Sequence, residues 1–211
     1  LTMLTSFIVM AVNTYLFKDY FGNAAALSII GLVQMASMFI TVPLVKPLVA
    51  KFGKKEISIV GMAFASVIYI ALFFLKGIET MPFIGIVAIA MMSMSFYSFI
   101  SYAFISDVID YHEYLTSLRE DATVYSIVSM SRKIGQAVAG GIGGVAIAAV
   151  GYDATVGTQP QEVLDGIYML GTLVPGVLYA IVAVALFMYP LNKQKTIDLS
   201  KDLEAKRNAN G

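Results

Sequence analysis

The chain has 211 residues, of which 58% are hydrophobic and 13% charged, and its formal net charge is +0. Soluble domains carry about 25% charged residues, so this composition excludes a water-soluble enzyme and favours a protein embedded in lipid. The chain contains no cysteine, which excludes a disulfide framework, a thiol nucleophile and a cysteine-bound metal.

Several stretches are apolar and long enough to cross a bilayer as helices, which takes about 20 residues. In chain order they are 1–17, 24–49, 57–75, 82–105, 122–150 and 164–189. Pro43 and Pro47 predict the end of the second stretch, while Pro175 predicts a kink in the last one and Pro190 its end. No charged leader precedes the first stretch, so we expect no signal peptide and a part of a longer protein. The predicted fold is an all-α membrane protein with six transmembrane helices.

The connections between these stretches alternate in charge. Most lysines and arginines outside the apolar stretches fall in 51–56, in 106–121 and after Pro190, whereas the other connections carry only Lys18 and Lys76. The positive-inside rule therefore predicts that the first group is cytoplasmic and that the chain ends in the cytoplasm. The basic residues flank membrane spans without interleaved aromatics, so we expect a lipid bilayer as partner and no nucleic acid.

The fifth stretch contains two cations, Arg132 and Lys133. Lys133 lies roughly 16 Å into the helix, near the middle of a hydrocarbon core about 30 Å thick. A charge at that depth is costly and indicates a functional site. Other polar or small residues follow at helical spacing and predict a face that lines a cavity: Tyr125, Ser129, Gln136 and Gly140. In the alternative, the helix begins near Ile134 and both cations lie at the membrane interface.

Further polar side chains occur in the other apolar stretches. They include Asn13 in the first, Gln34 in the second, and Tyr97 and Ser98 in the fourth. Hydroxyls, amides and aromatic faces together suit a polyhydroxylated ligand, although each one singly is also explained by hydrogen bonds between helices. The segment 140–144 has glycine at both ends, which allows close helix packing or sliding.

Acidic residues between the fourth and fifth stretches share one helical face. Asp107, Asp110 and Glu113 follow at intervals of three. They are candidates for an ion-pair gate that holds basic residues of another helix. Two alternatives remain at this point: a divalent metal site with His112, as in a membrane transferase, and a solvated loop.

Three sequence features together resemble one transporter family. They are Ser106-Asp-Val-Ile-Asp-Tyr-His-Glu-Tyr114 followed by Arg119, the segment from Tyr125-Ser to Lys133-Ile-Gly-Gln-Ala137, and Gly151-Tyr152. This pattern resembles the glycoside–pentoside–hexuronide:cation symporters of the major facilitator superfamily, the family of the melibiose permease. The basic loop 51–55 is similar to a short loop of the same superfamily.

The resemblance implies a twelve-helix fold in two halves. Residues 1–190 would correspond to helices seven to twelve and 191–211 to a cytoplasmic tail, and the N-terminal six-helix half would be the partner. It also implies that Lys133 takes part in sugar and cation binding and that Val128 and Ser129 line the sugar pocket. Asp107, Asp110 and Arg119 would form ion pairs that close the cytoplasmic side.

We therefore interpret the sequence as the C-terminal half of a bacterial inner-membrane sugar:cation symporter, which is not an enzyme. No cofactor or metal is expected besides Na⁺ or H⁺ as coupling ion. The residues predicted for substrate binding and coupling are Lys133, Arg132, Ser129, Val128, Tyr125, Gln136, Ser98, Tyr97, Gln34 and Asn13. Alternatives are a self-contained six-helix transporter working as a homodimer, a transferase using Mg²⁺ at the acidic cluster, and a sugar sensor derived from a transporter.

Overall fold

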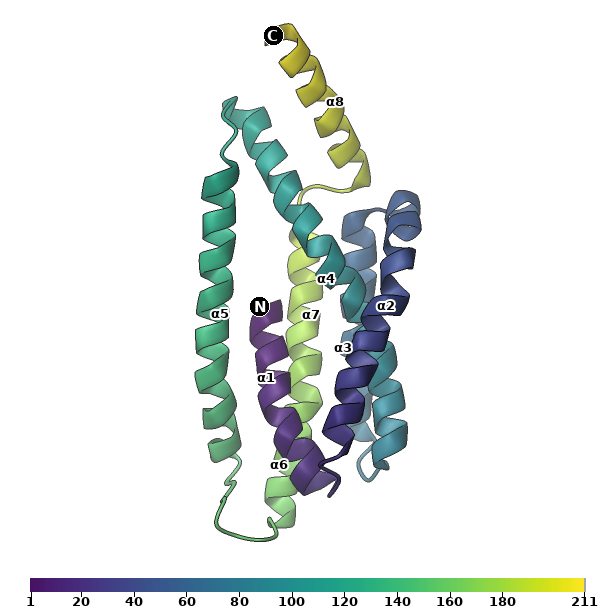
Figure 1. The fold of residues 1–211 in the computed structure, drawn as a ribbon, viewed down its shortest axis with the longest axis vertical. Helices are drawn as coiled ribbons and strands as arrows, with labels where there is room; N and C mark the ends of the chain where they lie inside the picture. The colour runs from purple at the N-terminus through teal and green to yellow at the C-terminus, as the bar shows by residue number, and fades with distance from the viewer. Residues whose placement is uncertain (211) are drawn as a thin grey trace.

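The computed structural model describes the backbone of residues 1–210 and the side chains of residues 1–208, so Gly211 of the predicted tail lies outside the described residues. The elements are helices arranged in an elongated bundle (Figure 1). In chain order they are α1 (Thr2–Tyr15), the π-helical turn η1 (Leu16–Tyr20), α2 (Ala26–Phe52), α3 (Lys54–Phe74), α4 (Thr80–Thr116), α5 (Asp121–Ala149), α6 (Gln161–Gly171), α7 (Leu173–Met188) and α8 (Lys193–Asn210).

The core of the bundle forms around α3 and α7. The helix α3 packs against both α7 and α4, α2 packs against α4, and α5 packs mainly against α1 at one edge (Figure 1). The largest fully buried side chains include Phe17, Phe83, Tyr168 and Tyr179. Phe17, Phe83 and Tyr168 pack together and join η1, α4 and α6, whereas Tyr179 of α7 packs against Tyr69 of α3.

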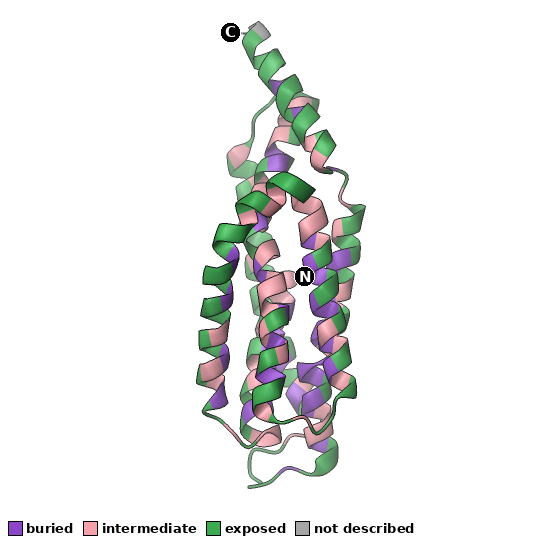
Figure 2. Ribbon diagram, turned by 90° about the vertical axis from the view of Figure 1, so that its right-hand side faces the viewer, coloured by how far each residue is buried: buried purple, intermediate pink, exposed green. Residues whose placement is uncertain are grey.

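The outer surface of the bundle is apolar. Figure 2 shows the buried residues as stripes where helices meet and exposed residues on the outward faces. Those outward faces carry large hydrophobic side chains such as Leu32, Phe39, Val60, Val67 and Phe187. Such a surface is stable in lipid and not in water, so lipid is the expected solvent of this bundle.

Among the residues that the structure describes, four helical segments are long and apolar enough to cross a membrane. They are α2, α3, α4 and the combined segment Gln161–Met188. The helices α1 and α5 are not among them. The first has only 14 residues, and the second carries the polar residues around Arg132. The all-helical class is confirmed, whereas the number of six spans stays a prediction.

The helix α4 is longer than predicted. It continues to Thr116, so most of the predicted connection 106–121 is helical and only 117–120 is not. With 37 residues it extends about 55 Å, far more than a hydrocarbon core of about 30 Å. Its last three turns carry the acidic residues and reach the part of the structure where α4 contacts α8.

The prolines have different effects in α2 and in the last span. The expected end near Pro43 and Pro47 is wrong, because α2 continues through both to Phe52. Membrane helices tolerate proline where neighbouring helices support them. Pro175, in contrast, breaks the last span as predicted: α6 ends at Gly171, whose carbonyl the proline ring would meet in a continuous helix. Thr172 bridges the break by donating from Oγ1 to the carbonyl oxygen of Tyr168 (2.6 Å).

The tail forms the helix α8, which packs on protein. Leu199 and Leu203 are buried together with Leu191 against Tyr114 and Tyr189. Leucines in such a polar tail could also rest on the membrane surface, but both of these pack on protein. The tail therefore connects the end of α4 with the end of α7.

Candidate functional site

A cavity of about 520 Å³ lies within the bundle between α1, α4 and α5, with contributions from α2, α3 and α7. Four of the predicted site residues line it: Tyr97, Ser98, Val128 and Arg132. Its other polar lining residues are Thr2, Ser6, Ser101 and Tyr102, and methionines and further apolar side chains complete the wall. The cavity therefore offers hydroxyls and aromatic rings next to one guanidinium group.

Arg132 is the charged residue of this cavity. Its Nη1 donates to the hydroxyl oxygen of Tyr102 at 3.0 Å, and its guanidinium carbon lies 5.5 Å from the centre of the Tyr102 ring. Tyr102 thus holds the planar guanidinium by a hydrogen bond and a cation–π contact. Tyr102 is another hydroxyl-bearing residue of the fourth apolar stretch and follows Ser98 by one helical turn, but it is not among the residues predicted for substrate binding.

Lys133 and its predicted companions do not line the cavity. Lys133, Ser129, Tyr125 and Gln136 are all exposed, and they are not among the residues that line the cavity. The face of α5 that packs on α1 instead carries Ala139 and its neighbours one turn apart, Gly143 and Ile147. Of the predicted polar stripe, Arg132 lines the cavity, whereas the other side chains are exposed.

The other two predicted residues are separate from the cavity. Asn13 is half-buried in α1, and Gln34 is exposed on α2. The structure thus brings four of the ten substrate and coupling residues together and leaves the other six outside the cavity wall.

Among the glycines of α5, Gly143 makes the closest contact with α1. A Cβ atom on Gly143 would lie 2.8 Å from Ala11 Cβ, whereas Gly140 and Gly144 have open space around them. The close helix approach thus runs through Gly143, and the predicted pair Gly140 and Gly144 lies on the open side.

The predicted gate residues lie at the α8 end of the bundle. Lys54 Nζ donates to Asp107 Oδ1 at 2.6 Å and joins the start of α3 to α4. Arg119 Nη1 lies 3.0 Å from Asp110 Oδ1 and 2.8 Å from Glu113 Oε2. The structure therefore has ion pairs at all three predicted gate residues, with Lys54 as a partner that the sequence did not identify.

Glu113 is the centre of a larger network. Arg207 of α8 holds it with two hydrogen bonds, Nε to Oε1 at 2.8 Å and Nη2 to Oε2 at 2.5 Å. These bonds, and those from Arg119, lower the pKa of Glu113 from its ordinary value to about 2. The same carboxylates raise the pKa of Arg119, with Glu113 as the main cause and Asp110 next. Glu113 therefore fixes both the α4–α5 connection and the C-terminal helix.

A metal site does not form at these acidic residues. In the described part of the chain, no group of three or more potential metal-binding side chains (His, Cys, Asp or Glu) comes together. His112 instead places Nε2 3.2 Å from Glu120 Oε2. The acidic side chains bind arginine and lysine instead.

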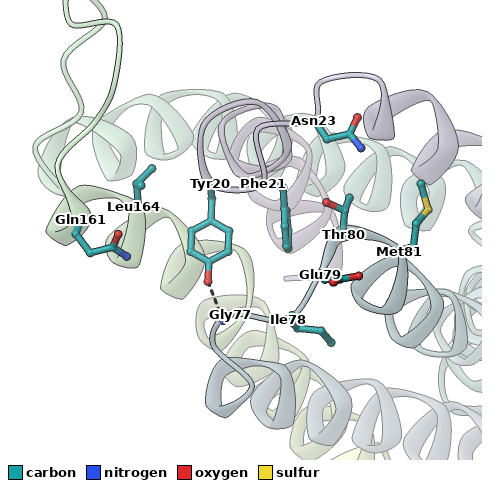
Figure 3. Close-up of a pocket in the computed structure, with 10 residues that line it drawn as sticks. All are labelled: Tyr20, Phe21, Asn23, Gly77, Ile78, Glu79, Thr80, Met81, Gln161 and Leu164. Carbon is teal, nitrogen blue, oxygen red and sulfur yellow. Dashed lines mark hydrogen bonds between the residues drawn. The ribbon is translucent and has the colours of Figure 1, made fainter.

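A second pocket of about 620 Å³ opens at the opposite end of the bundle (Figure 3). The Tyr20 hydroxyl there accepts a hydrogen bond from the Gly77 backbone N–H at 3.3 Å. Glu79, Asn23 and Gln161 are further polar residues of its wall. None of the predicted site residues lines this pocket, which is wide open to the surface.

One membrane cation escaped the sequence analysis. Lys46 lies in α2 between two prolines and lines a groove with Lys54 and the α4 residues Phe99 and Ile100. The sequence contained a signal for it, a lysine within an apolar run, which is the same signal that selected Lys133.

Comparison with known proteins gives a consistent result. Residues 1–193 match the family model described as MFS/sugar transport protein. The chain is 28% identical to the uncharacterized symporter YjmB of Bacillus subtilis (strain 168) over 98% of this chain and 46% of the relative. It is 28% identical to the glucuronide carrier protein homolog of Escherichia coli (strain K12) over 97% of this chain and 45% of the relative. It is 40% identical to the putative glycoside/cation symporter YagG of the same organism over 50% of this chain and 23% of the relative. The chain spans less than half the length of these curated relatives.

Proposed function

This chain belongs to the MFS/sugar transport protein family, and we propose that it is the C-terminal half of a bacterial sugar:cation symporter. The family consists of multi-pass membrane transporters and not of enzymes, which rules out the transferase alternative. The observation that carries the proposal is the cavity in which Arg132 lies among hydroxyls and aromatic rings, inside a bundle with an apolar outer surface.

The chain forms one wall of the proposed transport pathway. In this proposal residues 1–190 are helices seven to twelve, and an N-terminal six-helix half supplies the opposite wall. Substrate then binds near the membrane midplane between the halves, and rocking of one half against the other alternates access. The chain spans 46% and 45% of the length of two relatives, which supports the proposal that it is one half.

Lys133 is the proposed coupling residue. It is exposed on the side of α5 that contacts no other described helix, and no ion-pair partner is found for it among the described residues. In the whole transporter this side would face carboxylates of the N-terminal half. One ammonium shared between the cation site and the sugar site would link the binding of the two ligands. Coupling also requires that each ligand binds the inward-open and outward-open states with different affinity.

The α8 end is the proposed cytoplasmic side. The Lys- and Arg-rich connections lie at this end, which agrees with the positive-inside rule in a bacterial plasma membrane. The ion pairs of Asp107 with Lys54 and of Asp110 with Arg119 would close the inward side and separate when the transporter opens to the cytoplasm.

The test uses the full-length gene product in proteoliposomes with a sugar inside and outside. We expect an imposed Na⁺ or H⁺ gradient to drive sugar accumulation and the variant Lys133→Ala to lose it. The variant Lys201→Ala, which removes an exposed cation from α8, serves as the control and should keep it. Full accumulation by Lys133→Ala would refute the coupling role, and sugar binding without exchange across the membrane would favour a sensor.

A further inference from the structure

The pocket at the end of the bundle opposite α8 is built by three segments that are far apart in the sequence. They are the end of η1 with the residues after it, the α3–α4 connection with the start of α4, and the first turn of α6. Figure 3 shows the rings of Tyr20 and Phe21 between the start of α6 and the start of α4. The volume of about 620 Å³ lies within the range of roughly 300–1,000 Å³ that small-molecule sites occupy.

Contacts within this chain hold the walls of the pocket in place. The Tyr20 hydroxyl accepts a hydrogen bond from the Gly77 N–H at 3.3 Å, and its ring stacks on Tyr168 of α6 with the ring centres 4.6 Å apart. Lys76 Nζ lies 2.7 Å from Asp165 Oδ2 and ties the α3–α4 connection to α6. These contacts join all three segments to one another, so the pocket is formed before a ligand binds, which lowers the cost of binding.

The lining residues combine two kinds of group that bind sugars. Tyr20 and Phe21 contribute aromatic carbon, on which the C–H face of a sugar ring packs. The Glu79 carboxylate accepts hydrogen bonds, whereas the amides of Asn23 and Gln161 both donate and accept them. Neighbouring hydroxyl groups of a sugar likewise both donate and accept, so this set of side chains matches them.

The pocket is separate from the cavity that contains Arg132. The two share no lining residue. No residue of α5, which the structure describes in full, lines the pocket, so it does not belong to the side of α5 proposed to face the N-terminal half. With the α8 end in the cytoplasm, the pocket opens on the outer side of the membrane, where an imported sugar arrives.

We propose that this pocket is a second sugar site, at which a sugar docks on the outer surface before it enters the central cavity. The inference rests on the proposed transport function and its orientation, and it adds a site to them. Glu79 and Asn23 bind sugar hydroxyl groups, while Tyr20 and Phe21 pack against the ring. The rival occupant is an organic cation, because a carboxylate beside aromatic rings also suits an ammonium group.

The test measures how far a sugar protects a cysteine at this pocket from modification. The chain contains no cysteine, so Met81→Cys introduces one label site at an exposed lining residue once cysteines of the N-terminal half are replaced by serine. The full-length protein in proteoliposomes reacts with a membrane-impermeant maleimide, with and without methyl β-D-glucopyranoside, methyl β-D-galactopyranoside or methyl β-D-xylopyranoside. We expect at least one glycoside to slow the labelling of Met81→Cys. None should slow that of Gly157→Cys, an exposed position of the α5–α6 connection that does not line the pocket.

Two further substitutions separate this pocket from the central cavity. Glu79→Gln, added to Met81→Cys, should raise the glycoside concentration needed for protection by about 10- to 100-fold, the effect of one charge-assisted hydrogen bond. Glu79→Asp should retain part of the protection. Lys133→Ala should leave it unchanged, because Lys133 belongs to the proposed coupling site and not to this pocket.

Each outcome decides either the inference or the function beneath it. Absence of protection by all three glycosides, in a protein that accumulates sugar, overturns the inference and leaves the symporter intact. Protection that Lys133→Ala abolishes, or that Glu79→Gln leaves unchanged, arises from the central cavity and overturns it too. Slower labelling with tetramethylammonium but with no glycoside assigns the pocket to a cation and has the same consequence. If Glu79→Gln does not insert into the membrane, Asn23→Ala decides by the same ratio. Absence of accumulation of every sugar by a correctly inserted wild type refutes transport itself.

Discussion

Lys54 and Asp107 form a 2.6 Å ion pair that ties the start of α3 to α4 just inside the point where α4 leaves the bundle. The carboxylate side chain is only 8% exposed and the ammonium side chain 30%, so solvent screens this pair less than a surface pair. Both helices also pack against each other along their length. The pair therefore fixes the distance between two helices at the gate and not merely the position of a loop.

Removing either charge of this pair should loosen the α8 end of the bundle. We expect Asp107→Asn and Lys54→Gln each to lower the melting temperature of the chain in detergent, and the double variant to cost less than the sum. A coupling energy of about 0.5–3 kcal/mol is expected from residues in direct contact. The exchanged pair Lys54→Asp with Asp107→Lys should recover part of the loss. Strict additivity of the two single variants would mean that the contact contributes nothing.

Docking of α8 should depend on pH through Glu113. The pKa of this group is lowered from 4.5 to about 2 in the folded protein, so its contribution is present in full above about pH 4.5 and is lost as pH falls toward 2. Hydrogen exchange of α8, corrected for the pH dependence of the intrinsic exchange rate, should thus be unchanged between pH 8 and 5 and should accelerate below that range. Because Arg207 is half-exposed, salt should weaken docking at neutral pH.

A charge-neutral variant provides the control for this pH dependence. Glu113→Gln should release α8 already at pH 7 and should remove the acid-induced step between pH 4.5 and 2. Acceleration at the same low pH in Glu113→Gln as in the wild type would assign the transition to other carboxylates.

The order and class of the helices could be predicted because they depend on local composition. Apolar runs fixed α2 and α3 to within a few residues, and the break before Pro175 follows from a missing N–H group. The extension of α4 could not be predicted in the same way. Polar residues such as Asp110 occur both in loops and in helices that extend into water, so polarity alone does not distinguish the two.

The candidate site could be predicted only in part, for a geometric reason. Arg132 and Lys133 are adjacent, and adjacent residues on a helix point about 100° apart, so only one of them can face a given cavity. Which one does so depends on the face that α5 presents to α1, which is set by the fit of Gly143 against Ala11. Likewise the bond between Glu113 and Arg207 joins residues 94 positions apart, a relationship that spacing does not reveal.

The C-terminal helix should owe its position to protein contacts rather than to the membrane surface. Leu203 is 4% exposed and packs in the cluster with Tyr114, whereas Ile197 on the same helix is 41% exposed. We expect Leu203→Ala to destabilise docking by about 2–5 kcal/mol, the usual cost of truncating a buried leucine, and to speed hydrogen exchange of α8. Ile197→Ala is the matched control and should have little effect. If the two variants behave alike, or if Ile197→Ala alone releases the helix from liposomes, the membrane surface holds α8.

Two neighbouring glycines of α5 allow a test of the α1–α5 contact. A side chain at Gly143 would have to displace Ala11, whose Cβ is fixed to the backbone, while a side chain at Gly144 meets open space. We expect Gly143→Val to cost about 1–3 kcal/mol through overpacking and to lower the melting temperature in detergent. Gly144→Val carries the same change in helix propensity one residue away, so the difference between the two variants isolates the packing term.

The cavity lies between these same helices, so Gly143→Val should also shift Arg132 from Tyr102 and raise the exposure of Tyr102 to solvent quenchers. Equal melting temperatures for the two variants would show that α5 does not depend on this contact for its place in the bundle.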